Sequence, residues 1–311
     1  MTVGGWGAMT DAGRLRPVNE DALLADPPIF LVADGMGGHL AGDVASWSAV
    51  ERFVDLVGDG PISLQQVTGA LASANQAILD AAGADPQRSG MGTTVSGLAS
   101  VLTAGADHWM VFNIGDSRVY RLARGRMEQL TVDHSEAEEM VGAGRITREE
   151  ARSYHRRNVL TRSLGTNPAP DPDCWVFPPM DGERFMVCSD GLTTEVGDEA
   201  IRSCLASDAG PQEVAEALVH MAIAAGGRDN VTVIVVDGAV RTEPRSSIDV
   251  DTAPRPLNVT CRTIGGATSN TDGRRVGPLR GLHSSLGQRV SSSRACQGGT
   301  VVRSDRGRRE L

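Results

Sequence analysis

Clusters of apolar runs of strand length are the feature of this 311-residue chain that most restricts its fold. Short polar turns, such as the one at Arg124-Gly125, join several of the runs and indicate antiparallel hairpins. Amphipathic stretches with helical spacing come in pairs between and after these clusters. This order favours sheets with helices packed outside them over a regular parallel βαβ fold. The predicted strands are 29–33, 93–102, 108–114, 117–122, 185–188 and 231–236.

Four amphipathic stretches predict helices, at 41–57, 62–82, 197–206 and 211–225. The second stretch opens with a capping box of Ser63 and Gln66, and the fourth opens with Pro211 and stops at two glycines. Residues 135–157 are polar and charged and lie between two strand blocks. We interpret them as an inserted loop with some helix, which forms a flap.

The composition changes near residue 240. Before that point the chain carries 17 basic and 33 acidic residues, whereas residues 241–311 carry 13 arginines and 6 acidic residues. The second part is rich in Arg, Ser and Gly and has no strand or helix period, so it is predicted to be a disordered tail. Both a docking arm for acidic partners and a solvated extension without a dedicated role fit this composition. The predicted domains are therefore a folded body over 1–240 and a tail over 241–311.

The cysteine pattern and the hydropathy favour a cytoplasmic protein. The chain has five cysteines, with no Cys-x-x-Cys motif and no zinc-site spacing. Its first residues lack the pattern of a secretory signal, and no apolar run approaches the ~20 residues that span a bilayer. The formal charge of −9 argues against binding nucleic acid through bulk charge. We therefore expect neither a membrane nor a nucleic-acid partner.

Aspartates at the ends of apolar runs are the main functional signal. Asp34 and Asp190 each end a run and precede a glycine, Asp116 ends a third run, and Asp229 lies just before the last one. Each alone is typical of a turn or a helix cap. Strand ends at one edge of a sheet converge, however, and carboxylates gathered there repel one another unless cations are bound. Oxygen ligands without His or Cys favour Mg²⁺ or Mn²⁺, and a glycine such as Gly35 lets a backbone carbonyl approach the metal.

A polar segment near the N-terminus adds Arg16, Glu20 and Asp21. A planar guanidinium binds phosphate through two hydrogen bonds, and two cations with an arginine provide what a phosphoryl group requires. The competing interpretation is that Arg16 is a surface arginine before a turn.

Seven motifs follow one another along residues 5–238. They are Arg16-x-x-Asn19-Glu20-Asp21, Asp34-Gly-Met-Gly-Gly-His39, Gly92-Thr93-Thr94, Asn113-Ile-Gly-Asp116-Ser-Arg118, Leu130-Thr-x-Asp133-His134-Ser135, Ser189-Asp190-Gly191-Leu192 and Asp229-Asn230-x-Thr232. In this order and spacing the chain resembles a bacterial member of the metal-dependent protein phosphatases, the protein phosphatase 2C (PPM) type. The tail has no counterpart in the resemblance.

The resemblance implies an α+β fold, a four-layer α/β/β/α sandwich whose two mainly antiparallel sheets are flanked by helix pairs. It also implies two Mn²⁺ or Mg²⁺ ions at one end of the sandwich, a weaker third ion, and a flap over residues 134–160. By matching residue, Asp34 would bridge the two metals and the Gly35 carbonyl would ligate one of them. The remaining roles would be Asp190 and Asp229 at the other metal, Glu20 and Asp21 on metal-bound waters, Asp116 with Asp190 at the third metal, and Arg16 on the substrate phosphate.

The implied activity is that of a protein serine/threonine phosphatase that hydrolyses phosphomonoesters. A hydroxide that bridges the metals would attack phosphorus in line, without a phosphoenzyme intermediate, and the catalytic residues would be Arg16, Asp34, Asp190 and Asp229. The expected partners are phosphorylated proteins, substrates of a cognate Ser/Thr kinase, and the expected state is a monomer. Two alternatives are a catalytically silent phosphoprotein-binding module, which the filled metal positions disfavour, and a dedicated regulator.

Several motif residues keep two interpretations. Met36 stands where animal relatives place the histidine proposed to protonate the leaving group, and His39 is interpreted as structural. Thr93 and Thr94 fit either strand packing or hydrogen bonding behind the metal ligands. His134 and Ser135 are interpreted as caps of a flap helix.

Overall fold

The computed structural model describes residues 3–37, 41–58, 60–238, 257–258 and 300–302, and two antiparallel sheets pack face to face in it. The first sheet has the strand order β1 (Val3–Asp11), β11 (Val231–Gly238), β10 (Arg184–Cys188), β7 (Arg118–Ala123) and β8 (Arg126–Gln129). The second has the order β12 (Leu257–Asn258), β9 (Asp173–Phe177), β6 (Ala106–Ile114), β5 (Val95–Thr103), β3 (Ile29–Met36), β2 (Asp21–Asp26) and β13 (Thr300–Val302), with β4 (Gly92–Thr93) paired to β3.

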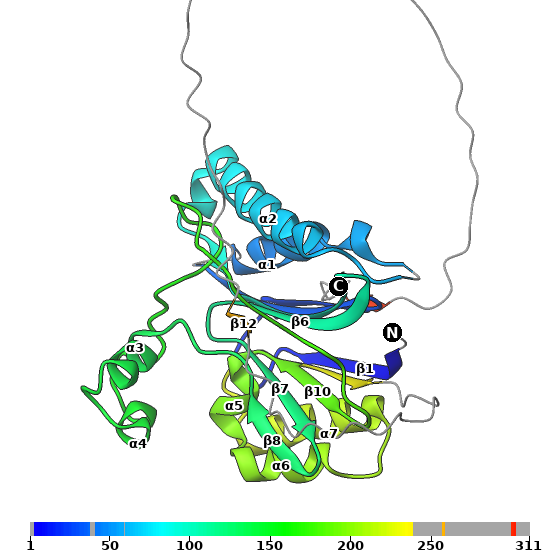
Figure 1. Ribbon diagram of the computed structural model, residues 1–311. Coiled ribbons are helices and arrows are strands. Elements are labelled where there is room, and N and C mark those ends of the chain that lie inside the picture. Colours follow the sequence, from blue (N-terminus) through cyan, green and yellow to red (C-terminus); the bar gives the residue numbers. More distant parts are fainter. Residues whose placement is uncertain (1–2, 38–40, 59, 239–256, 259–299, 303–311) are drawn as a thin grey trace, which may run out of the picture.

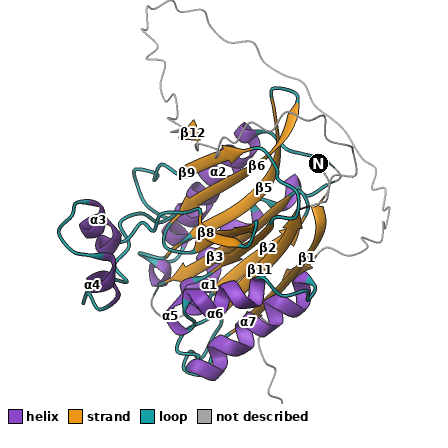
Figure 2. Ribbon diagram, turned by 60° about the horizontal axis from the view of Figure 1, so that its bottom comes forward, coloured by secondary structure: helices purple, strands orange, loops and turns teal. Residues whose placement is uncertain are grey.

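Helices cover both outer faces of this pair of sheets (Figure 1). The second sheet is covered by α1 (Gly42–Glu51) and α2 (Leu64–Ala84), which are followed by the 3₁₀ turns η1 (Val54–Leu56) and η2 (Pro86–Arg88). The first sheet is covered by α5 (Asp190–Glu195), α6 (Asp198–Leu205) and α7 (Pro211–Ala225). Two more helices, α3 (Glu136–Gly142) and α4 (Arg148–Arg152), stand away from the sheets in both views (Figures 1 and 2). The predicted four-layer α/β/β/α sandwich is confirmed.

Three apolar layers hold the sandwich together, and β3 shows how one strand serves two of them. Successive side chains on a strand point to opposite faces. Ile29 and Leu31 of β3 therefore pack toward α1 and α2, whereas Phe30 and Val32 pack in the layer between the sheets. The third layer lies between the first sheet and α5 to α7.

The predicted elements are all present, with shifted ends. The expected helix over 41–57 ends at Glu51, and the 3₁₀ turn η1 follows it. The predicted hairpins are also confirmed: β5 pairs with β6 and β7 with β8 across two-residue turns. Residues Ala104 and Arg124 have positive φ values of 51°, and the glycines that follow them have 79° and 74°. Such turns match the right-handed twist of the flanking strands.

The sequence analysis missed strands β1, β2, β8 and β9 and helix α5. Strand β1 is rich in glycine, which is depleted in strands. Gly7 is there because a Cβ atom would collide with the backbone of Gln212, where α7 begins against β1. The glycine at position 7 is therefore required by the close packing of α7, and strand propensity does not explain it.

Most of the predicted tail lies outside the described residues. Two short segments of it are described, and they pair with the opposite edges of the second sheet, Leu257–Asn258 with β9 and Thr300–Val302 with β2. The boundary near residue 240 stays a prediction. None of the helices in the described ranges has the length and hydropathy that crossing a bilayer requires.

A chain ended after Gly238 is expected to keep its fold, because, of the residues that the structure describes, every member of the three apolar layers precedes that point. Its unfolding temperature should stay within about 4 °C of the full chain, the shift produced by ~1 kcal/mol in a protein of this size. The bared edges of β2 and β9 should increase self-association at high concentration. Thermal unfolding and light scattering measure the two effects. Loss of cooperative unfolding would show that the tail is part of the fold.

Candidate active site

Five aspartates from distant parts of the chain meet at one end of the two sheets, and we call them the acid cluster. Asp21 opens β2 directly opposite Asp34 of β3. Asp116 follows β6, whose end pairs with the start of β5 beside β3. In the first sheet, Asp190 follows β10, and Asp229 precedes the neighbouring strand β11. The charges of the other four all act on Asp34, so the structure brings these predicted site residues together.

Burial and mutual repulsion raise the pKa values of Asp21, Asp34, Asp116 and Asp190 in the acid cluster. Burial raises the pKa of Asp34 well above its ordinary range, and the charges of Asp21 and Asp190 raise it further. Burial is also the main reason that the pKa of Asp21 rises to about 7, that of Asp116 to about 8 and that of Asp190 to about 6. Carboxylates held this close are stable only when they are protonated or when cations neutralise them.

The donor set of the acid cluster fits a hard divalent cation. Asp21 Oδ1 is buried and accepts no hydrogen bond from the described residues. Among the described residues, no group of three or more His, Cys, Asp or Glu side chains is arranged so that it could hold a metal ion by itself. Mg²⁺ and its analogues are usually held by one or two carboxylates and keep several waters, whereas zinc prefers a closed set of His and Cys. The cluster therefore suits Mg²⁺ or Mn²⁺ and does not suit zinc.

Asp21 also fastens the two sheets to each other at the site. Its Oδ2 accepts hydrogen bonds from Ser189 Oγ at 2.8 Å and from Thr232 Oγ1 at 2.6 Å, both on the first sheet's side. Its backbone N–H donates to Asn19 Oδ1 at 3.1 Å. Ser189, Thr232 and Asn19 were quoted in the motifs without a role, and their role is to orient Asp21.

Two threonines fix the backbone of Asp34. The Asp34 N–H donates to Thr94 Oγ1 at 3.0 Å, and Thr93 Oγ1 donates to the Asp34 carbonyl at 2.8 Å. Both threonines are buried. Of the two interpretations of Thr93 and Thr94, hydrogen bonding behind the acid cluster is therefore the one that the contacts support.

Gly35 and Glu20 pack against the start of α1. A Cβ atom at Gly35 would collide with the carbonyl oxygens of Gly42 and Glu20. The half-buried Glu20 carboxyl accepts a hydrogen bond from the Gly42 backbone, although burial raises its pKa. The missing Cβ of Gly35 thus lets α1 approach β3, a reason for glycine that the metal interpretation had not included.

Arg16 lies at the rim of the acid cluster and pairs with one of its members. Its Nη2 donates to Asp229 Oδ2 at 2.8 Å, and about half of the Arg16 side chain is exposed. Asn230 anchors the segment that carries Arg16, because its Nδ2 donates to the carbonyls of Ala12 and Val18 and its Oδ1 accepts from the Glu20 N–H. The guanidinium is held beside the cluster with one side open to solvent.

The flap prediction over 134–160 matches α3, α4 and their connections. Ser135 caps α3, as expected, by accepting a hydrogen bond from the Glu138 N–H. His134 does not cap it: its Nδ1 accepts from the Gly115 N–H, next to Asp116. Met36 lies at the end of β3, and His39 is outside the described residues.

A hollow of about 760 Å³ lies where the chain returns from the flap to β9, and its lining includes Arg162, Asp173 and Trp175. It contains no member of the acid cluster, so this hollow is separate from the candidate site.

Comparisons with known proteins agree with this geometry. A model of the family described as Protein phosphatase 2C matches residues 17–209, more than half of the chain. The chain belongs to the protein phosphatase 2C family. The match extends from the residue after Arg16 into the segment after α6.

Relatives in this family are named as serine/threonine phosphatases. The chain is 38% identical to PstP of Mycobacterium tuberculosis over 237 residues, which is 75% of this chain and 44% of that protein. It is 35% identical to the phosphatase stp of Listeria monocytogenes over 239 residues, or 73% of this chain and 93% of that one. The chain thus spans less than half the length of PstP and nearly all of stp.

Solved structures of family members superpose on the described body. The crystal structure of M. tuberculosis PstP matches with a TM-score of 0.70 and 36% identity, over 75% of this chain and 97% of that one. The PstP catalytic domain in complex with two manganese ions matches with a TM-score of 0.68 and 35% identity, with the same coverage.

Proposed function

We propose that this chain is a metal-dependent protein serine/threonine phosphatase that hydrolyses phosphomonoesters. The acid cluster beside the half-exposed Arg16 is the observation that carries the proposal, because it joins a site for divalent cations to a group that binds phosphate. The relatives that are named serine/threonine phosphatases, and the PstP complex with two manganese ions, support it. In this proposal the protein acts in the cytoplasm as a monomer, on the products of a serine/threonine kinase.

The proposed roles follow the positions of the side chains. Asp34, Asp190 and Asp229 with the Gly35 carbonyl hold two cations, either Mn²⁺ or Mg²⁺, and Asp116 with Asp190 holds a weaker third. When bound, such cations supply positive charge for the phosphoryl oxygens and bring the pKa of a coordinated water molecule toward neutrality. Asp21 and Glu20 orient water from the side of β2, and Arg16 donates hydrogen bonds to the phosphoryl oxygens.

No side chain is proposed to carry the phosphoryl group. No cysteine in the sequence has an arginine six positions after it, as cysteine phosphatases require. The hydroxyls of Ser189 and Thr232 already donate to Asp21. Met36 has no proton to give, so water on the Asp116 side of the site is proposed to protonate the leaving alkoxide.

Hydrolysis of p-nitrophenyl phosphate with and without Mn²⁺ tests the proposal. Turnover should require the added metal, stop in EDTA and return with excess Mn²⁺. A matched set of phosphoserine, phosphothreonine and phosphotyrosine peptides should then show faster release of phosphate from the first two. Sustained turnover in excess chelator, or a preference for phosphotyrosine, would refute the proposal.

Arg16→Ala should weaken substrate binding without weakening metal binding. A charge-assisted pair of hydrogen bonds contributes about 1.5–3 kcal/mol, so kcat/KM for a phosphopeptide should fall roughly 10- to 150-fold. Mn²⁺ affinity should be at least that of the wild type, because Asp229 loses a competing cation.

Arg14→Ala is the matched control for this change. Arg14 is an exposed arginine two residues earlier, and its backbone N–H pairs with the Gly227 carbonyl whatever its side chain. Its removal should leave kcat/KM within about twofold, the range of an ordinary surface substitution. Equal losses in both variants would indicate a general charge effect and exclude a specific contact from Arg16.

A further inference from the structure

The link that carries Asp116 connects the two sheets. Strand β6 belongs to the second sheet and β7 to the first, and Gly115, Asp116 and Ser117 form the connection between them. Arg118, the first residue of β7, lies opposite Cys188 of β10, two positions before Asp190. Arg118 therefore lies beside the part of the acid cluster that contains Asp116 and Asp190.

Arg118 follows Asp116 by two residues, and its charge acts on both Asp116 and Asp190, as the charge of Asp133 acts on Asp116. A guanidinium beside these carboxylates competes with a cation held between them, because it offers positive charge and hydrogen-bond donors.

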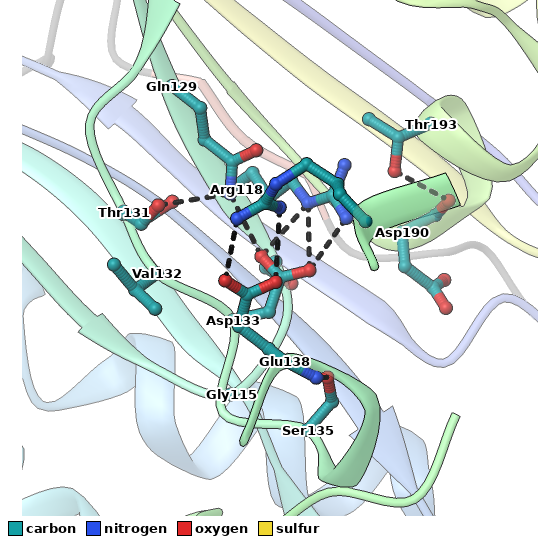
Figure 3. A network of polar contacts seen from close by, with 12 residues as sticks. Gly115, Arg118, Gln129, Thr131, Val132, Asp133, Ser135, Glu138, Asp190 and Thr193 are labelled. Atoms are coloured by element: carbon teal, nitrogen blue, oxygen red, sulfur yellow. Dashed lines mark hydrogen bonds and ion pairs between the residues drawn. The ribbon is translucent and has the colours of Figure 1, made fainter. Parts of the chain in front are cut away.

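Asp133 binds this guanidinium through several hydrogen bonds (Figure 3). Arg118 Nε donates to Asp133 Oδ1 at 2.9 Å, and Nη2 donates to Oδ2 at 2.6 Å. Its Nη1 donates to the hydroxyl of Tyr120 at 3.1 Å. All three nitrogens of the guanidinium therefore have partners on the side of Asp133 and Tyr120.

Neighbouring contacts keep this arrangement in place. Gln129 Nε2 donates to Asp133 Oδ1 at 3.0 Å. His134, the next residue, receives the Gly115 N–H on Nδ1 at 3.1 Å and donates its own N–H to the Gly115 carbonyl at 2.9 Å. Together with the Arg118–Asp133 ion pair, these contacts fix the chain before and after Asp116.

We propose that Asp133 is a positioning residue that pairs with Arg118, neutralises it and keeps it off Asp116 and Asp190, so that these two acids remain available to a divalent cation. The proposal rests on the proposed function of the acid cluster. It assigns a purpose to the motif Leu130-Thr-x-Asp133-His134-Ser135, which the catalytic roles leave unused. Its consequence is that the weaker cation site is tuned by an ion pair that does not itself bind metal.

A set of charge variants tests the pairing through Mn²⁺ binding measured by calorimetry and by the EPR signal of free Mn²⁺. Asp116→Asn identifies the binding class that belongs to this site. Asp133→Asn should weaken that class about tenfold or more, which corresponds to about 1.4 kcal/mol, since it leaves the charge of Arg118 unpaired beside this site. Arg118→Gln should bind at least as tightly as the wild type. The double variant Asp133→Asn, Arg118→Gln should return to within about threefold of the wild type, because the competing charge is gone.

Asp237→Asn is the matched control. Arg184 binds Asp237 through the same two-pronged geometry, at 2.6 and 3.0 Å, near the far end of β10 and β11. The Asp237→Asn variant should leave Mn²⁺ binding unchanged even if it lowers stability.

Each outcome decides the proposal. It is overturned if Asp116→Asn removes no class of bound Mn²⁺, if the double variant binds as weakly as Asp133→Asn, or if Arg118→Gln alone loses tenfold. If Asp133→Asn does not fold, Arg118→Gln decides. Failure of the wild type to hydrolyse p-nitrophenyl phosphate with Mn²⁺ would instead refute the proposed function, whatever the binding data show.

Discussion

Asp34→Asn is expected to lower phosphatase activity at least about 10³-fold, the scale on which losing a ligand of the reacting metals acts. Asp34 feels the charge of all four other members of the acid cluster, so its carboxylate lies at the centre of the proposed site. Asparagine has nearly the same shape, and the bonds to Thr93 and Thr94 use only the backbone of residue 34. The fold should therefore persist while Mn²⁺ binding weakens, which calorimetry measures.

Asp80→Asn is the control for the same chemical change. Asp80 lies on α2 and accepts a hydrogen bond from Gln76 on the exposed surface. It should retain full activity. An Asp34→Asn variant with normal Mn²⁺ affinity and more than a tenth of the activity would remove Asp34 from the site.

The metal-free protein is expected to lose stability as the pH rises from 5 to 8. The pKa values of Asp21 and Asp116 are about 7 and about 8 in the folded state, against an ordinary value of 3.8 for an aspartate. Between these limits the folded state binds more protons than the unfolded state, so the free energy of unfolding falls as pH increases. Each pKa unit corresponds to about 1.4 kcal/mol, so the loss should reach several kcal/mol, or roughly 10 °C in unfolding temperature.

Bound metal should reverse this trend. Mn²⁺ binds the deprotonated carboxylates, so at pH 8 a concentration 100 times the dissociation constant should restore about 2.7 kcal/mol for each site. Thermal unfolding in EDTA and in Mn²⁺ at the two pH values measures both effects. Asp34→Asn should flatten the pH dependence in EDTA, because it removes one of the repelling charges. Greater stability of the metal-free protein in EDTA at pH 8 than at pH 5 would contradict the electrostatics of the cluster.

The sequence could predict the acid cluster because strand ends carry it. Asp34, Asp116, Asp190 and Asp229 each stand at the limit of an apolar run, and antiparallel pairing brings such limits to a shared edge. The hairpins were predictable for a similar local reason, since Arg124-Gly125 is a turn signal read from two residues.

What the sequence could not predict depends on contacts between distant residues. Strand β1 has an atypical strand sequence in part because Gly7 must leave room for α7, which follows much later in the chain. The ion pair of Arg16 with Asp229 and the anchoring of Asn230 to Ala12 join the two ends of the folded body. No periodicity or local motif encodes such pairs. For the same reason the sequence indicated a metal-site role for Glu20 and Gly35 but not their packing against the start of α1.

The flap is attached to the body at a narrow base. Ser135 and Leu160 form an antiparallel bridge where the chain leaves and returns, and the His134 carbonyl accepts the Thr161 N–H at 2.8 Å. These backbone contacts close the insertion, and the side chain of Glu136 on α3 adds contacts to Tyr154 and Arg156 on the return. We therefore expect that the flap beyond this base can change in length without shifting the strands that place the acids.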